Sequence, residues 1–259
     1  MEAIKDLRLA VLIDADNVPS ANVKAMFEEI AKYGVPTFKR IYADWTKPHV
    51  SGWKNVLLEN AITPIQQYSY SVGKNSSDSA MIIDAMDILY SGKVDGFCIV
   101  SSDSDFTRLA TRLREAGMKV IGIGEKKTLA PFITACDKFI YFEILKANAA
   151  PVTNKPLTRH PRKTAAQAAQ PEPVQAPINK VDQEFVRLVS ESVADIADED
   201  GWAFLGELGN FILKKKPDFD PRNYGFTKLF QLIKSLGKFE IDERDSGKRN
   251  IKHIYVRAK

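Results

Sequence analysis

Residues 9–18, LAVLIDADNV, set the pattern for the first half of this 259-residue chain. Five apolar residues run without interruption into two aspartates, and a short continuous apolar run is typical of a strand buried on both faces. Pro19 then opens a pattern in which apolar residues recur every three or four positions until Gly34, which predicts a helix. A strand over residues 8–14 followed directly by a helix is one unit of an α/β fold.

The same alternation continues to about residue 142. Further strands are predicted over residues 37–43, 62–67, 96–100, 119–123 and 139–142, with helices over residues 52–58, 78–89, 105–116 and 129–135. Strands that alternate with helices form a parallel sheet with helices on both faces. The fold class predicted for residues 1–146 is therefore α/β, a three-layer, Rossmann-like parallel-sheet domain.

The second half of the chain is organised differently. Residues 147–180 hold six of the 13 prolines, no aromatic residue and a single acid, Glu172, which predicts a flexible linker. As a coil it would span about 30–35 Å, and about 100 Å if extended, so it could place a second domain almost anywhere around the first. Residues 181–259 show three amphipathic helical stripes and then two apolar runs around a basic turn at residues 245–250, which predicts a winged helix.

Charge and cysteine content narrow the functional classes. The net charge is +4, and residues 214–259 hold 13 basic against six acidic residues, so this half of the second domain could face nucleic acid. An ordinary solvated surface explains the same charges. The two cysteines, Cys98 and Cys136, form no metal-binding motif, and no apolar segment near the start resembles a signal or a membrane span. We expect a cytoplasmic protein without structural zinc.

Acidic residues follow several predicted strands. Asp14 and Asp16 end the first strand, Asp78 precedes a helix, and Asp103 and Asp105 follow the strand at residues 96–100. Because the carboxyl ends of parallel strands share one edge of the sheet, these side chains are expected to meet. Carboxylates without His or Cys suit magnesium, and we predict Asp14, Asp78, Asp103 and Asp105 as direct or water-mediated ligands.

Two further residues extend this predicted site, and capping is the competing explanation for all of it. Asn17 would hold a water or a phosphate oxygen, and Lys74 would pair with a backbone phosphate. Asp and Asn before helices are often N-caps, which explains each position separately. Capping does not require the second acid of each pair, and clustered carboxylates repel unless a cation offsets the charge. Asp84 lies about 120° around the helix from Asp78, so we expect it to support the site or the fold.

Three segments resemble the signature blocks of the NYN domain, the LabA-like branch of the PIN-like ribonuclease superfamily: LIDADNV, GKNSSDSAMIIDAMDIL and IVSSDSDFTRLATRLREAGMKVIGIG. The resemblance covers residues 7–145. It implies a PIN-like three-layer fold and an endoribonuclease that depends on Mg²⁺ or Mn²⁺. Its acidic positions correspond to Asp14, Asp78, Asp103 and Asp105, with Asn17 as the polar companion.

Residues 181–259 resemble a second domain type, the OST-HTH or LOTUS domain. The resemblance rests on GWA at residues 201–203, on LGELGNFILKKKPDFDPRNYGFTKLFQLIKSL and on the FEI that follows. It implies a winged helix that binds RNA or, in some proteins, holds a protein partner. The basic residues predicted to contact phosphates are Lys214, Lys215, Lys216, Arg222, Lys248 and Arg249.

Three functions compete at this point. The first is a magnesium-dependent endoribonuclease in which the LOTUS domain captures RNA near the aspartates. The second is a non-catalytic RNA-binding or adaptor protein with a structural acidic pocket. The third, a haloacid-dehalogenase-type phosphatase, would use Asp14 and Asp16 as a D-x-D motif, but the helix that begins at Pro19 leaves no room for the usual cap insertion.

Overall fold

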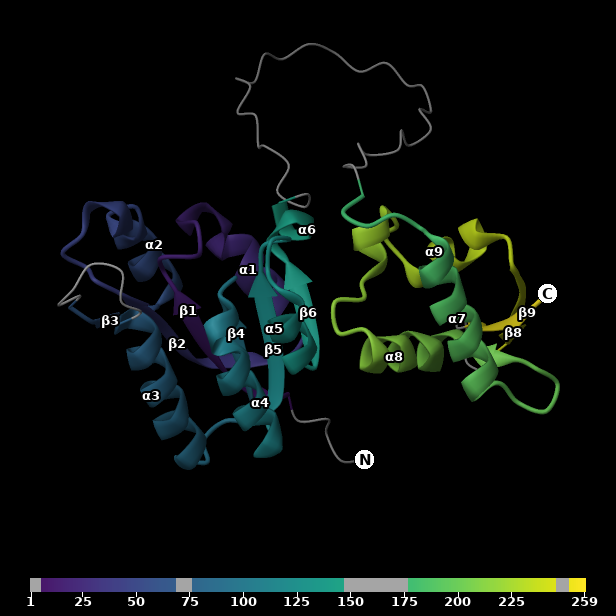
Figure 1. Cartoon of the computed structure of the whole chain (residues 1–259), viewed down its shortest axis with the longest axis horizontal. Coiled ribbons are helices and arrows are strands. Elements are labelled where there is room, and N and C mark those ends of the chain that lie inside the picture. The colour runs from purple at the N-terminus through teal and green to yellow at the C-terminus, as the bar shows by residue number, and fades with distance from the viewer. Residues whose placement is uncertain (1–5, 69–75, 147–176, 246–251) are drawn as a thin grey trace, which may run out of the picture.

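The computed structural model describes residues 6–68, 76–146, 177–245 and 252–259 (Figure 1). Its first part is a six-stranded, entirely parallel sheet with the strand order β3-β2-β1-β4-β5-β6. The strands are β1 (Arg8–Asp14), β2 (Val35–Ala43), β3 (Thr63–Gln66), β4 (Gly96–Val100), β5 (Lys119–Gly124) and β6 (Lys138–Tyr141).

Helices cover both faces of this sheet, which confirms the predicted three-layer α/β domain. Side chains of β1 alternate between the two layers, with Leu9 and Val11 in one apolar core and Ala10 and Leu12 in the other. One core is closed by α1 (Val23–Ile30), α2 (Trp53–Asn60) and α6 (Phe142–Lys146), and the other by α3 (Ser76–Tyr90), α4 (Thr107–Glu115) and α5 (Ala130–Ala135).

The order of the strands determines where a site can form. From β1 the chain builds outward through β2 and β3, and then returns to the other side of β1 as β4. The neighbouring strands β1 and β4 therefore lead to helices on opposite faces, and this leaves a crevice beyond their carboxyl ends. Asp14 ends β1, and the acidic segment after β4 begins three residues beyond Val100.

The predicted elements differ from the observed ones mainly at their ends. The helix predicted over residues 105–116 begins as the 3-10 turn η3 (Ser104–Phe106) and continues as α4. The helix predicted from Pro19 likewise begins with η1 (Ser20–Asn22), and η2 (Pro48–Val50) precedes α2. The strand predicted over residues 139–142 ends at Tyr141, because Phe142 already begins α6.

The second part is a winged helix, as predicted. Three helices, α7 (Gln183–Ile196), α8 (Leu205–Lys215) and α9 (Leu229–Leu236), pack on a three-stranded sheet with the order β7-β9-β8. The sheet contains β7 (Ala203–Phe204) and the antiparallel pair β8 (Phe239–Asp245) and β9 (Lys252–Ala258), with the 3-10 turn η4 (Pro221–Tyr224) between α8 and α9. Val189, Leu208, Leu232 and Val256 are central to its core.

The two domains lie side by side, with the edge strand β6 facing the winged helix (Figure 1). The backbone N–H of Phe139 in β6 donates a 2.8 Å hydrogen bond to the carbonyl oxygen of Pro217. None of the described helices is both long and apolar enough to cross a membrane.

Candidate functional site

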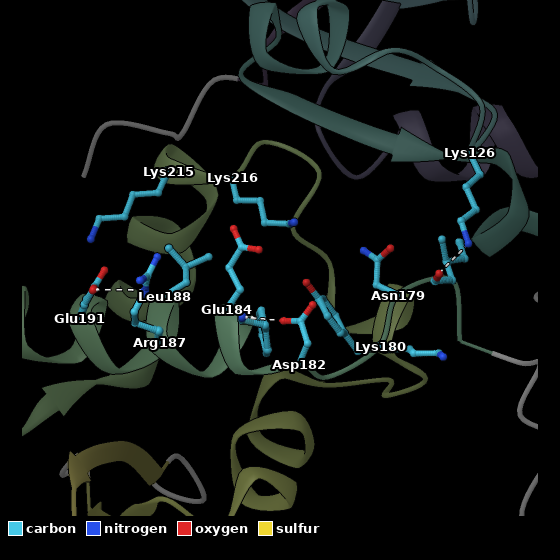
Figure 2. Close-up of a pocket in the computed structure, with 13 residues that line it drawn as sticks. Lys126, Asn179, Lys180, Asp182, Glu184, Arg187, Leu188, Glu191, Lys215 and Lys216 are labelled. Atoms are coloured by element: carbon cyan, nitrogen blue, oxygen red, sulfur yellow. Dashed lines mark hydrogen bonds and ion pairs between the residues drawn. The ribbon is translucent and has the colours of Figure 1, made fainter.

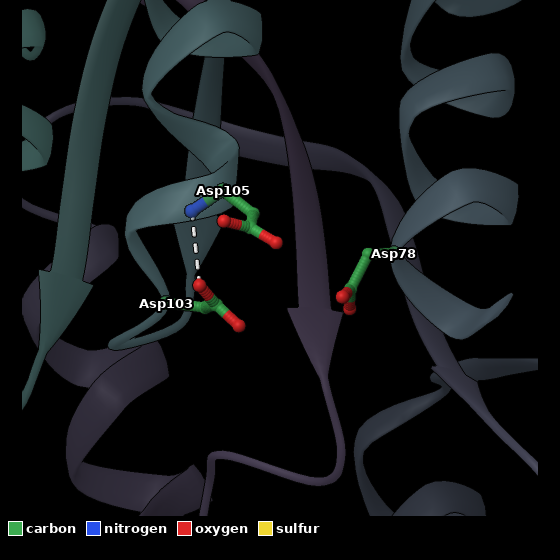
Figure 3. Close-up of side chains that lie close together, drawn as sticks. All are labelled: Asp78, Asp103 and Asp105. Atoms are coloured by element: carbon green, nitrogen blue, oxygen red, sulfur yellow. Dashed lines mark hydrogen bonds between the residues drawn. The ribbon is translucent and has the colours of Figure 1, made fainter. Parts of the chain in front are cut away.

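Three carboxylates from two separate elements meet at the crevice. Asp78 projects from the first turn of α3, and Asp103 and Asp105 come from the segment that joins β4 to α4 (Figure 3). One carboxylate oxygen from each of the three lies within 4.8 Å of the others. Asp78 is almost completely buried, whereas Asp105 is exposed, so the group opens to solvent on one side.

Asp14 lies outside this group of three but is coupled to it. The residue is 1% exposed, and its carboxylate accepts three hydrogen bonds: from Asn17 Nδ2 at 2.6 Å, from Ser101 Oγ at 2.8 Å and from the Asp16 backbone at 3.1 Å. Burial raises the pKa of Asp14, and the hydrogen bonds from Asn17 and Ser101 partly oppose that rise.

The charges of the cluster are felt most strongly at Asp78. Burial, together with the negative charges of Asp14, Asp103, Asp105 and Asp16, raises the pKa of Asp78 to about 7. A carboxyl group held in this way is only partly ionised near neutral pH. A cation placed among the carboxylates would remove the repulsion, so the residues present fit a hard divalent ion with oxygen ligands.

Capping and convergence both occur here. Asp103 is the N-cap of η3 and accepts the backbone N–H of Asp105 at 2.9 Å. Only one of its two oxygens is used in this way, and Figure 3 shows the Asp103, Asp105 and Asp78 carboxylates directed into the same space. Capping alone therefore accounts for Asp103 but does not explain why Asp78 faces it across the crevice.

Ser101 is a site residue that the sequence reasoning missed. It is fully buried, and its hydroxyl donates to Asp14 while accepting the backbone N–H of Asp103 at 3.0 Å. Gly124 makes room for this arrangement, because a Cβ at residue 124 would lie 2.6 Å from the Ser101 carbonyl oxygen. The available signal was the serine immediately after an apolar strand and two residues before Asp103.

The remaining predicted residues around the aspartates are distributed as follows. Asn17 is held by Asp14, and Asp16 accepts a 3.4 Å hydrogen bond from Ser77 Oγ at the start of α3. Asp84 accepts hydrogen bonds from Arg40 and Tyr42 and does not belong to the group of three converging carboxylates. Lys74 falls outside the described residues.

The basic residues predicted to contact RNA are only partly available for it. Lys214 is exposed, Lys215 pairs with Asp195 at 2.7 Å, and Lys216 lies 3.8 Å from Asp218. Arg222 is directed away from this group, into contacts with Glu29 and Asp220. Lys248 and Arg249 fall outside the part of the chain that the structure describes.

Arg222 departs most clearly from its predicted role. Its guanidinium donates two hydrogen bonds to Glu29, at 2.9 and 2.7 Å, and two to Asp220, at 2.9 and 2.7 Å. With four of its donors directed at carboxylates, this side chain offers little to a phosphate.

The strand order, the crevice and its acidic residues define a PIN-like α/β domain. Residues 8–145 match the model of the NYN domain, and the chain belongs to the NYN family. Residues 176–251 match the model of the OST-HTH/LOTUS domain, in agreement with the winged-helix structure.

Two solved structures are similar to parts of the chain. One is a protein of unknown function, VPA0982, from Vibrio parahaemolyticus, with 20% identity, a TM-score of 0.45, and coverage of 54% of this chain and 96% of that one. The other is an uncharacterized protein from gene locus NE0665 of Nitrosomonas europaea, with 36% identity, a TM-score of 0.29, and coverage of 37% and 92%. No curated protein matches the chain.

Proposed function

We propose that the chain is a magnesium-dependent endoribonuclease whose reaction takes place at Asp78, Asp103 and Asp105. The observation that carries this proposal is the approach of their carboxylate oxygens to within 4.8 Å of one another at the topological switch point. Three like charges this close are unfavourable without a cation. Membership of the NYN family supports the same reaction class.

Some of the site residues are proposed to bind the metal ion, and others to position the reacting groups. Asp78, Asp103 and Asp105 would hold Mg²⁺ or Mn²⁺, which when bound would activate a water and neutralise charge on the phosphate. Asp14, buried behind them, orients Ser101 and through it the backbone of Asp103. Asn17, held by Asp14, is proposed to position a water or a phosphate oxygen.

The LOTUS domain is proposed to capture the RNA. Lys214 and Lys215 end α8, where the carboxyl end of the helix leaves the basic side chains exposed. Contacts from such side chains to phosphates release counterions and do not depend on base sequence. The aspartates repel phosphate until a cation is bound, so most of the affinity for RNA is assigned to this second domain.

The decisive experiment compares RNA cleavage by the wild type with that by Asp103→Asn. Purified protein is incubated with mixed RNA and DNA in Mg²⁺, in Mn²⁺ or in chelator. Wild type is expected to cleave RNA only with a metal ion, and Asp103→Asn is expected to lose this activity while it keeps its fold, because asparagine caps η3 about as well as aspartate. Asp87→Asn, an exposed aspartate on α3, is the matched control and should cleave like the wild type.

The capping hydrogen bond that the Asp105 N–H donates to the Asp103 carboxylate also favours a second candidate, a non-catalytic RNA-binding or adaptor protein. In that case the acidic crevice would serve the fold only. Metal-independent RNA binding without cleavage in any of the three conditions would support this alternative and reject the nuclease.

A further inference from the structure

The first domain presents a surface to the winged helix that combines a sheet edge with a buried acid. We call it the docking surface and define it as Glu29 of α1 with Phe139 and Tyr141 of β6. Opposite it lies the docking loop, residues 217–224, which follows α8 and includes η4. Each part of this contact involves a different kind of interaction.

The sheet edge is the first part. β6 is the last strand in the sheet, so its outer backbone groups have no neighbouring strand to pair with. The docking loop supplies a partner instead: the Phe139 N–H donates to the Pro217 carbonyl oxygen at 2.8 Å, and the Tyr141 hydroxyl donates to Asp218 Oδ2 at 2.9 Å. The loop thus covers an edge that would otherwise be open to pairing with another chain.

The ion cluster is the second part. Arg222 binds Glu29 through two parallel hydrogen bonds, and two more of its donors bind Asp220 in its own loop. The Glu29 side chain is only 3% exposed, and Lys32, in the turn that follows α1, donates to it at 2.6 Å. Paired bonds of this kind fix both distance and orientation, so they favour one arrangement of the two domains over many.

The third part of the contact is the segment that leads into the winged helix, Ile178 and Asn179. Ile178 packs partly buried against both cores of the first domain, and its carbonyl oxygen accepts a 2.7 Å hydrogen bond from Lys126 Nζ. The next residue, Asn179, donates its backbone N–H to the Asn223 carbonyl oxygen in the docking loop at 2.8 Å. Figure 2 shows Lys126 reaching from the first domain toward this segment, on the opposite side of the pocket from Lys215 and Lys216, which also line it.

We propose that the docking loop binds the docking surface in solution, so that the two domains form one body with the winged helix held in a single orientation relative to the aspartates. The occupant of the docking surface is therefore a segment of the same chain. Charge complementarity, the covered sheet edge and the packed Ile178 support this choice. A covalent connection gives an effective concentration on the order of 1 mM, so a dissociation constant of about 0.1 mM would keep roughly nine chains in ten docked.

This arrangement differs from the expectation drawn from the composition of residues 147–180, which allowed the second domain almost any position. Docking would present Lys214 and Lys215 to RNA from one fixed place. The proposal does not depend on the nuclease function, because the contacts lie on α1 and β6 and involve neither metal nor RNA.

Hydrogen–deuterium exchange of the full-length protein tests the proposal. The backbone amide of Phe139 is the reporter, because its acceptor belongs to the docking loop. We expect the double variant Glu29→Gln with Tyr141→Phe to exchange this amide at least tenfold faster than the wild type, and its radius of gyration from X-ray scattering to increase. The matched control is Glu28→Gln, the same change at the exposed neighbouring position of α1, which should behave like the wild type.

Exchange of the Leu12 amide in the buried strand β1 reports on the fold of the first domain in every sample. If the Leu12 amide of the double variant exchanges rapidly, the first domain has unfolded. Arg222→Gln then serves as a second variant, because it disrupts the ion cluster from the winged-helix side. The proposal is overturned if the Phe139 amide exchanges at its unprotected rate in the wild type. It is also overturned if the folded variants exchange that amide as slowly as the wild type.

Discussion

The hydroxyl of Ser101 lies 2.8 Å from Oδ2 of Asp14 and links the end of β4 to the end of β1. Ser101 Oγ also accepts the backbone N–H of Asp103, so this one buried side chain determines how the two aspartates are placed relative to each other. A group this well connected affects geometry without touching a substrate. Ser101 is therefore a positioning residue, and its removal has consequences that differ from those of removing a ligand.

Ser101→Ala should slow RNA cleavage about tenfold or more and leave the apparent KM for RNA nearly unchanged. The change leaves Asp14 with one hydrogen-bond donor fewer and the N–H of Asp103 without its acceptor, at a cost of about 1–3 kcal/mol of stability. Steady-state cleavage and thermal unfolding measure the two effects. Ser91→Ala is the control, because it removes a 2.6 Å hydroxyl hydrogen bond at the far end of α3. Equal losses of rate in both variants would argue against a positioning role.

Asp78→Asn should stabilise the metal-free protein at pH 8 while abolishing cleavage. The pKa of Asp78 is raised to about 7, so the folded state binds this proton more tightly than the unfolded state does. Its contribution to stability is therefore full at low pH and is lost as pH rises toward 7. Asp78→Asn has no such group to deprotonate. Its free energy of unfolding should exceed that of the wild type by about 1–4 kcal/mol at pH 8, and should differ little from it at pH 4.

Denaturant unfolding in chelator, with wild type and Asp78→Asn compared at both pH values, measures this difference. Saturating Mg²⁺ should reverse the ranking at pH 8, because only the wild type gains binding energy from the ion. A wild type that is the more stable protein at pH 8 in chelator would show that the carboxylates do not repel as the geometry implies.

Acid should separate the domains before it unfolds the first one. Burial alone would raise the pKa of Glu29, but hydrogen bonds from Arg222 and Lys32 outweigh it and lower that pKa to about 2. The docked state therefore gains stability from Glu29 above about pH 4.5 and loses it as pH falls toward 2. Tyr33 also donates a hydrogen bond to Glu29, and Asp220 shares the Arg222 guanidinium with it.

Scattering between pH 7 and pH 3.5 checks this prediction through the radius of gyration. The wild type should expand below about pH 4.5, and Glu29→Gln should show a weaker dependence over the same range. Far-ultraviolet circular dichroism on the same samples distinguishes undocking from unfolding. Parallel curves for the two proteins would assign the expansion to other groups.

Lys214→Ala should weaken RNA binding more than Lys215→Ala does. Lys215 is already paired with Asp195, whereas Lys214 is exposed, so Lys214 is the better counterion-releasing contact. Each lost phosphate contact should reduce the slope of log K against log salt by roughly 0.7–0.9. A salt titration of RNA binding measures the slope, with Lys24→Ala on α1 as the control. Unchanged slopes for both variants would move the RNA site away from the end of α8.

The strands of the first domain were predictable because they are buried on both faces. The runs at residues 9–13 and 96–100 are continuously apolar, and the strands predicted around them, residues 8–14 and 96–100, agree with β1 and β4. Phe142 was misassigned to a strand because its side chain is as apolar as those of β6, and only the position of the chain beyond the sheet makes it the start of α6. Local pattern contains no information about where a neighbouring strand ends.

Residue type and position along the chain were sufficient to bring the acids to one edge of the sheet, because parallel strands share a carboxyl end. They were not sufficient to assign roles. Asp14, Asp78 and Asp103 look equivalent in the sequence, yet Asp14 is buried behind Ser101 and Asp78 faces Asp103 and Asp105. Likewise Arg222 reads as one of a basic series, and its partner Glu29 lies 193 positions away in the chain. Periodicity and spacing carry short-range information, whereas charge pairing and docking depend on distances that exist only once both domains have folded.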